Sequence, residues 1–334
     1  MTTIIDRLNE NINIINHSCL NLRHKNSSCS KCMDNCEAHA ITITSYRKRI
    51  MIDWEKCINC LACSSVCPTE VFWPKSGEVK IFLQDIIQKL NAFDTVNIGC
   101  SYCKKQVDDE DIVYIPSLRM ISYEYFVVMA LKGAKTVKFF TSNCNICPVK
   151  DCKTNLDSEI AKCEKFLDAI DRETFEASIL DVSEYEKGDL KKKKYSPVVS
   201  RRELFGFFKQ RAKESLAIGF GLVDKGEKQS LQVVENYRLP KKRAVLLDTL
   251  QKMNIDISQN MIDKLNSELS DFGKITIDSE KCIKCEACAK LCPTGALMSN
   301  KLEDDKKEIL FNATYCINCG ICRLSCRQKA IKEG

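Results

Sequence analysis

The sequence predicts an α+β architecture, with a compact cysteine-rich module at each end, a small parallel α/β domain between them and a helical connector. Three observations lead to this prediction. Two cysteine runs of identical spacing lie near the C-terminus, and closely similar runs recur near the N-terminus in the opposite order. Between them, the apolar residues follow an alternation of strand and helix patterns. The predicted boundaries are residues 1–80, 81–182, 183–270 and 271–334.

The C-terminal runs have the spacing of iron–sulfur ligands. Each reads C-x2-C-x2-C-x3-C, and the second starts 34 residues after the first. They comprise Cys282, Cys285, Cys288 and Cys292, closed by Pro293, and then Cys316, Cys319, Cys322 and Cys326. This module resembles a two-cluster bacterial ferredoxin, in which each run gives three thiolates to one [4Fe-4S] cluster and its fourth to the other. Zinc is the alternative, but a zinc site needs only four ligands.

The N-terminal region carries a second module of this kind, with its two runs in swapped order. Residues 50–69 align with residues 275–294 without a gap, and SSCSKCMDNCEAHAI aligns with INCGICRLSCRQKAI. The matching ligands are Cys57, Cys60, Cys63 and Cys67, followed by Pro68, and the upstream Cys29, Cys32 and Cys36.

One ligand is missing from this N-terminal pattern. The position that matches Cys316 is Asn26, which cannot bind iron as a thiolate does. We expect Cys19 to supply the ligand through a longer loop. His17 or His24 is the alternative, and a cluster without any of these would be a [3Fe-4S] or a labile one.

The cross-ligation of ferredoxins implies four [4Fe-4S] clusters. In the N-terminal module the two ligand sets are Cys29, Cys32 and Cys67 with Cys19, and Cys57, Cys60 and Cys63 with Cys36. In the C-terminal module they are Cys282, Cys285 and Cys288 with Cys326, and Cys316, Cys319 and Cys322 with Cys292.

From residue 81 the pattern predicts a small parallel α/β domain. Helices are expected over IFLQDIIQKLNAF, SYEYFVVMALKGA and NLDSEIAKCEKFLDAI, and strands over TVNIGC, DIVYIPS, TVKFF and FEASIL. Binding sites in such domains lie at the carboxyl ends of the strands. Cysteines fall there, with Cys100 and Cys103 after the first strand and Cys144, Cys147 and Cys152 after the third.

Residues 96–153 resemble the delta subunit of the hydrogenases coupled to heterodisulfide reductase in methanogens. The resemblance rests on IGCSYC, on IPSLRMI with the helix into LKGAKTV, and on CPVKDCK. It implies a [2Fe-2S] cluster with the ligands Cys100, Cys103, Cys147 and Cys152. The chain has Ser117 where that family usually has a cysteine, and Cys144 is a further candidate ligand. Zinc, free thiols or a larger cluster are the alternatives, and we expect Cys163 to be a buried structural thiol.

Residues 183–270 are predicted to form a basic helical connector. SRRELFGFFKQRAK predicts an amphipathic helix, and KKRAVLLDTLQKM and SQNMIDKLNSELS predict two more. SRRELF resembles a twin-arginine export signal, but no apolar segment with a cleavage site follows it.

The composition predicts a cytoplasmic protein. Disulfide frameworks belong to short secreted domains, whereas this chain has 22 cysteines in 334 residues. We find no signal peptide and no run of 18 apolar residues, so no transmembrane segment is expected. The formal net charge of +6 counts the thiols as neutral. Thiolates bound to clusters would make the loaded protein near neutral or acidic, so nucleic acid is not an expected partner.

The motifs predict electron transfer rather than substrate conversion. The sequence contains no P-loop, HExxH or GxSxG motif, and its three histidines all lie within residues 1–39. We therefore expect an iron–sulfur protein of the polyferredoxin type, acting as a subunit or dedicated partner of a hydrogenase, a formate dehydrogenase or a flavin-based oxidoreductase. The alternatives are a free polyferredoxin shuttle and a regulatory or assembly protein that senses oxygen or redox state.

Overall fold

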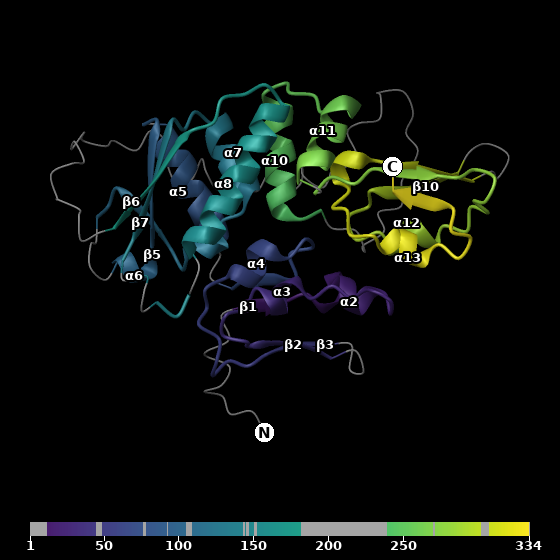
Figure 1. Ribbon diagram of the computed structural model, residues 1–334, viewed down its shortest axis with the longest axis horizontal. Coiled ribbons are helices and arrows are strands. Elements are labelled where there is room, and N and C mark those ends of the chain that lie inside the picture. The colour runs from purple at the N-terminus through teal and green to yellow at the C-terminus, as the bar shows by residue number, and fades with distance from the viewer. Residues whose placement is uncertain are drawn as a thin grey trace, which may run out of the picture. The chain divides into compact units, whose positions relative to one another are not determined.

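Four parallel strands form the central sheet in the order β6-β5-β7-β8. They are β5 (Thr95–Cys100), β6 (Ile112–Ile115), β7 (Thr136–Thr141) and β8 (Glu176–Asp181). The helices α5 (Glu78–Leu90), α7 (Tyr123–Leu131) and α8 (Cys152–Ala169) lie side by side along the sheet (Figure 1). The predicted parallel sheet in the middle of the chain is thus confirmed.

The computed structural model describes residues 12–44, 49–75, 78–91, 93–104, 109–142, 144, 147–149, 152–181, 239–269, 271–301 and 307–333. All of them fall within one compact unit, which comprises Met1–Tyr185 and Asn236–Gly334. The helix predicted over SRRELFGFFKQRAK lies outside the described residues.

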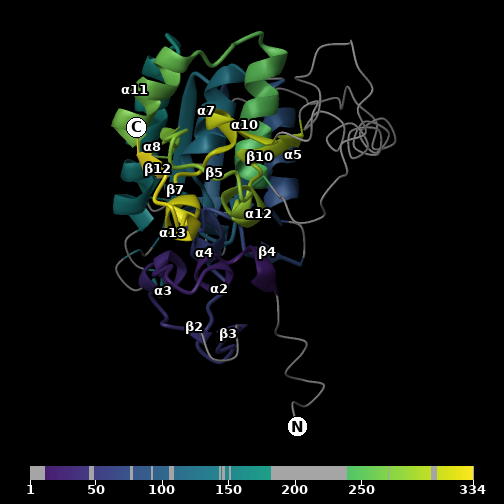
Figure 2. The ribbon, with the colours of Figure 1, turned by 90° about the vertical axis from the view of Figure 1, so that its right-hand side faces the viewer.

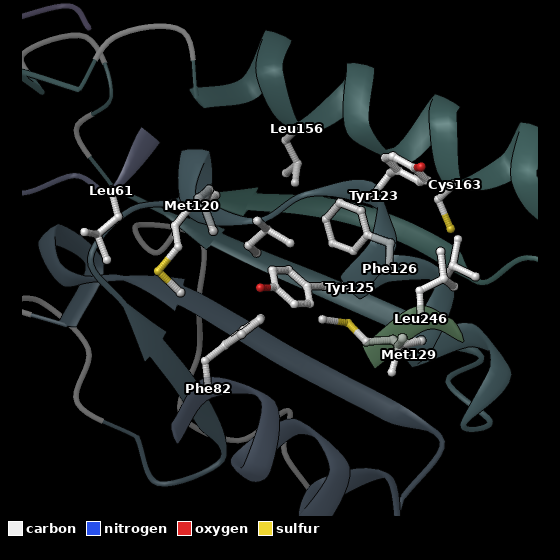
Figure 3. Packing of buried hydrophobic residues seen from close by; sticks show 14 of the residues in the cluster. Leu61, Phe82, Met120, Tyr123, Tyr125, Phe126, Met129, Leu156, Cys163 and Leu246 are labelled. Atoms are coloured by element: carbon white, nitrogen blue, oxygen red, sulfur yellow. The ribbon is translucent and has the colours of Figure 1, made fainter. Parts of the chain in front are cut away.

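Helix α7 forms the centre of the hydrophobic core. Its sequence, YEYFVVMAL, has no polar stripe, and a helix that is apolar on all sides is stable only when it is surrounded. Every residue from Tyr123 to Met129 is buried. On the sheet side, the rings of Phe126 and Phe139 meet edge to face at 5.7 Å. Figure 3 shows the buried side chains of α7 grouped with Leu246.

Leu246 belongs to α10 (Lys241–Lys252), which packs against α7, and the following helix α11 (Gln259–Leu269) packs against α8. Both helices were predicted as parts of a connector. Their apolar residues Leu246, Leu250 and Leu265 are buried in the central core. These two helices are therefore structural parts of that core.

The C-terminal module has two pairs of antiparallel strands and two short helices. Strand β9 (Ile275–Ile277) pairs with β12 (Ile331–Glu333), and β10 (Leu297–Lys301) pairs with β11 (Lys307–Phe311). The short helices that carry cysteines are α12 (Ala287–Leu291) and α13 (Ile321–Ser325), and the 3-10 turn η6 (Ala313–Tyr315) precedes Cys316.

The N-terminal module has the same pairs. Strand β1 (Ile12–Ile14) pairs with β4 (Phe72–Pro74), and β2 (Ile41–Thr44) pairs with β3 (Arg49–Ile52), the two strands that Figure 2 shows side by side. Between them lie the 3-10 turn η1 (Asn16–Ser18) and the helices α2 (Leu20–Arg23), α3 (Lys31–Asp34) and α4 (Ala62–Val66).

The two modules are circular permutations of each other, and their strand registers agree. In β2–β3, Ile41 pairs with Ile52, and the repeat-equivalent residues Ile331 and Ile277 pair in the same way in β12–β9. Strands β2 and β3 are consecutive in the N-terminal module, whereas their counterparts β12 and β9 are the last and first strands of the C-terminal one. The swapped order of the cysteine runs therefore leaves the fold unchanged.

Candidate metal-cluster sites

Left-handed backbone conformations shape the cysteine loops. Asn59 and Leu61 have φ of 54° and 60°, and their counterparts Lys284 and Glu286 have φ of 54° and 63°. Each such non-glycine residue costs about 1 kcal/mol or more, yet the conformation recurs at matching positions. It turns the chain between successive cysteines, so that their thiols face one side of the loop. Strain of this kind is typical of functional sites.

Site A is a pocket lined by four cysteines from both N-terminal runs. They are Cys36, Cys57, Cys60 and Cys63, the set predicted from cross-ligation. The apolar side chains of Ile12, Ile41 and Ile52 complete the lining, and Cys63 is buried.

Site B is the neighbouring pocket, and it contains Cys19. Its cysteines are Cys19, Cys29, Cys32 and Cys67. The strand register explains why Cys19 takes the place of Cys316. Each cysteine stands five residues after the end of a matching strand, β1 or β11, and directly after a 3-10 turn, η1 or η6.

Neither of the alternative histidines lines site B. The ring Nδ1 of His24 accepts a hydrogen bond from the Asn26 amide (3.3 Å), and His17 is exposed. The seven additional residues of this module lie between Cys19 and Cys29 and contain α2. Of the three candidates named in the sequence, Cys19 is the one that lines this pocket with Cys29, Cys32 and Cys67.

Site C is the corresponding pocket of the C-terminal module. Its cysteines are Cys292, Cys316, Cys319 and Cys322. Gly273 lies so close to this pocket that an added Cβ would collide with the Sγ of Cys316. A glycine is required there because the backbone passes directly beside a ligand thiol.

The predicted set of site D is Cys282, Cys285, Cys288 and Cys326. The thiols of Cys282 and Cys285 are close enough to contribute to raising the pKa of Cys288, after the larger effect of burial. The Sγ of Cys326 accepts a hydrogen bond from the Ala330 amide (3.3 Å). Cys36, its counterpart in site A, accepts the same bond from Ala40 (3.4 Å), which supports assigning Cys326 to site D.

The central pocket lies where the strands β5 and β7 end. It is lined by Cys100, Cys144, Cys147 and Cys152, together with Ser117, Thr141 and Ser142. In the strand order β6-β5-β7-β8, the chain leaves β5 toward one edge of the sheet and leaves β7 toward the other. The crevice between two such strands, at their carboxyl ends, is the usual position of a binding site in this kind of fold.

Cys103, a predicted ligand of the central cluster, does not line this pocket. It is fully buried in an apolar cluster with Ile112 and Phe140. Burial, with smaller contributions from Cys100, Asp181 and Cys144, raises its pKa to about 12. Cys144, a further candidate in the sequence, is in the pocket instead.

Each of these sites contains at least one thiol that burial makes hard to ionise without a metal. Burial, with a smaller contribution from neighbouring thiols, raises the pKa of Cys32, Cys152, Cys319 and Cys322 to about 12. A bound metal would supply the positive charge that stabilises the thiolates. Backbone amides already point at sulfur, as Val71 does at Cys67 Sγ (3.3 Å). Soft thiols, amide donors and apolar walls together fit an iron–sulfur cluster.

Within the described ranges, no group of three or more His, Cys, Asp or Glu side chains is arranged to hold a single metal ion. No helix among the described residues has the length and apolar character needed to cross a membrane.

Two protein-family models match parts of this chain. A 4Fe-4S dicluster domain matches residues 27–71, and a 4Fe-4S binding domain matches residues 275–298. The chain is similar to two pyruvate synthase subunits PorD, with 40% identity over 57 residues for the protein of Methanocaldococcus jannaschii and 41% over 56 residues for that of Methanothermobacter marburgensis. Each match covers 17% of this chain and less than two thirds of the relative, 62% and 59%.

An uncharacterized ferredoxin of Methanocaldococcus jannaschii is 38% identical over 58 residues, which make up 17% of this chain and 74% of that protein.

Sequence reasoning missed the residues that surround the cysteines without binding metal. Ser117, Arg119 and Glu70 are buried and contact the cysteine loops or α10. Ser117 stood out in the sequence as a departure from a family pattern. The other two carried no signal, because their partners are distant in the chain.

Proposed function

Because the chain belongs to the ferredoxins that bind 4Fe-4S clusters, we propose that it relays single electrons through four [4Fe-4S] clusters, one in each of sites A to D. The observation that carries this proposal is that sites A, B and C each gather three cysteines of one run and the fourth of the other. This is the ligand exchange of two-cluster ferredoxins. The predicted set of site D follows the same rule.

We propose one more cluster in the central pocket. Cys100, Cys147 and Cys152 keep the roles predicted for them, and the position of Cys144 supports it as the fourth ligand in place of Cys103. A [2Fe-2S] cluster needs four thiolate ligands, which this pocket offers. Zinc, or no metal, is the alternative at this site.

The chain would act within a larger redox system as a subunit or dedicated partner. The similarity to pyruvate synthase subunits supports a place in a multisubunit oxidoreductase. A hydrogenase, a formate dehydrogenase or a flavoprotein remains our proposed donor or acceptor, and the cytoplasm the proposed location. The free shuttle and the sensor or assembly protein are the competing functions.

Metal analysis of anaerobically purified protein tests the cluster content. We expect about 16 irons from four cubanes and about two more from the central pocket. Cys144→Ala should remove the central pair of irons, whereas the matched Cys103→Ala should retain them. Zinc in the central pocket would contradict the fifth cluster, and fewer than about 12 irons would contradict four cubanes.

An anaerobic pull-down from the native cells tests the partner. A stoichiometric co-purifying enzyme with flavin, nickel or molybdenum would identify the complex. Intact clusters without any stable partner would support the free shuttle or the sensor.

A further inference from the structure

We infer that the five cysteine sites form one unbranched series, in the order central pocket, site A, site B, site C and site D. The inference rests on the proposed clusters and adds their connectivity. An electron accepted at one end would then pass through every site before it leaves at the other.

The first junction joins the central pocket to site A through Ser117. Its side chain lines the central pocket, is 2% exposed and donates a hydrogen bond to the carbonyl oxygen of Cys60 (2.8 Å). One small buried residue therefore contacts a ligand loop of site A and faces the ligands of the central pocket.

Arg119 strengthens the same junction from two residues further on. Its guanidinium donates to Glu37 Oε1 (3.1 Å) and to the Asn35 carbonyl (3.3 Å), and these residues flank Cys36. Its own carbonyl accepts a bond from Ser65 (2.6 Å) in α4, the helix that contains Cys63. The segment 117–119 thus contacts the chain beside three of the four cysteines of site A. Charge-assisted bonds from a buried arginine hold such contacts in a fixed geometry.

Sites A and B adjoin through two short helices. Helix α4 contains Cys63 of site A and is followed directly by Cys67 of site B. Helix α3 likewise contains Cys32 of site B and lies just before Cys36 of site A. In the C-terminal module, α12 and α13 connect sites C and D in the same way.

Arg23 makes the junction between sites B and C. It ends helix α2, which starts directly after Cys19. Its Nε donates to the carbonyl of Leu291 (3.2 Å), the residue before Cys292 of site C. A second bond, from Nη1 to the His17 carbonyl (3.1 Å), fixes the guanidinium to its own module.

The first turn of α10 holds the same two modules together. Lys242 donates to the carbonyl of Ser65 (2.5 Å), between Cys63 and Cys67. The adjacent Arg243 donates to the Asp271 carbonyl (3.1 Å) and to that of Thr314 (3.5 Å), two residues before Cys316. Consecutive residues of one helix therefore reach the ligand loops of both modules.

The solvent exposure of the cysteines independently indicates which sites lie at the two ends of the series. Of all 22 cysteines, Cys144 and Cys285 are the two that are exposed. Cys144 belongs to the central pocket and Cys285 to site D, which are the two ends of the proposed order. A one-electron redox protein docking at either end would find a ligand at the surface.

Each transfer moves one electron and nothing else. The cluster that gives the electron is oxidised as the next one is reduced, with no bond broken and no proton moved. The electron comes from a one-electron redox protein at one end and leaves to another at the opposite end.

Electron paramagnetic resonance of the fully reduced protein tests the order, because neighbouring paramagnetic clusters broaden each other's signals. Removing site B with Cys29→Ala should sharpen the signals of sites A and C and leave that of site D unchanged. Removing site D with Cys285→Ala should sharpen the signal of site C alone. A sharpened site A signal in Cys285→Ala, or an unchanged site C signal in Cys29→Ala, would overturn the series.

A second pair of variants keeps every ligand in place. Arg23→Gln should retain the full iron content and reduce the broadening between sites B and C. Lys25 is exposed in the same loop, and Lys25→Gln is the matched control, which should leave the broadening between sites B and C unchanged. Equal effects in the two variants would overturn the Arg23 junction. Wild-type protein without iron would instead contradict the proposed function, so the two failures are distinct.

Discussion

Glu70 shows how one residue adapts a repeated module to its surroundings. It follows Cys67, Pro68 and Thr69 and has φ of 46°, whereas the matching residue of the C-terminal module is Gly295 with φ of 72°. Glycine adopts this conformation without strain, and glutamate does not. The Glu70 carboxylate accepts bonds from the amides of Lys241 (2.7 Å) and Lys242 (2.8 Å) at the start of α10. The N-terminal module therefore tolerates strain at this position in order to cap a helix of the core.

Glu70→Gly should lower the free energy of unfolding by about 2 kcal/mol, because the helix cap is lost. The relief of backbone strain at this position and the greater chain entropy of glycine in the unfolded state largely offset each other. Thermal unfolding of the anaerobic, loaded protein measures this change. The exposed His39, with φ of 47°, is the matched control. His39→Gly should change stability by less than about 0.5 kcal/mol, since it caps nothing. Equal losses in the two variants would contradict the capping role.

Cys163 should behave as a structural thiol. It is 0% exposed, and burial raises its pKa above the ordinary value of 9.0. We expect no alkylation of Cys163 in the native protein, as peptide mapping after iodoacetamide treatment would show. The contribution of Cys163 to the free energy of unfolding is fully present below pH 9. It decreases as the pH rises above 9, because the thiol ionises in the unfolded chain and stays protonated in the folded one. Cys163→Ala should retain the iron content, and its free energy of unfolding should decrease less above pH 9 than that of the wild type.

At the scale of the element, most helices and strands could be predicted from the sequence, but the elements against which they pack could not. The periodicity of α10 and α11 gave both helices, but their packing on α7 and α8 depends on contacts with residues more than 90 positions away. The internal repeat was sufficient to predict that the N-terminal cysteine runs form a second module. It could not show that Cys103 is buried with Ile112 and Phe140 while Cys100 lines the pocket, because this depends on how the chain folds after β5.

The loop between Cys19 and Cys29 should be dispensable for metal binding. Deleting residues 20–26 leaves Cys19-Ser27-Ser28-Cys29, the spacing found at Cys316 and Cys319. We expect this variant to retain the iron of site B, measured as iron per protein. The loop at site C uses left-handed Asn318 and Gly320, whereas Ser30 has φ of −125°. Adding Ser30→Gly should therefore stabilise the deletion variant, by about 1 kcal/mol. A loss of about four irons would contradict the assignment of Cys19.

At the scale of the whole molecule, two buried arginines join segments that are distant in the chain. Arg119 and Arg243 are 5% and 3% exposed, and their bonds join segments that are between 28 and 84 residues apart. Both residues look like surface arginines in the sequence. The cysteine groupings of sites A, B and C could be predicted from the spacing of the runs, because each run is local in the chain. The order that we propose for the sites could not be predicted, because it is inferred from these long-range contacts.

The longer loop at site B also affects how the molecule would respond to damage. Nine residues separate Cys19 from Cys29, against two in the matching loop of site C, and closing the longer loop costs about 1 kcal/mol more. In a series, site B is the middle position. An oxidant that destroyed this cluster alone would stop transport from end to end, yet each half of the protein would still exchange electrons with its own partner. Partial oxidation would then convert one relay into two independent electron carriers.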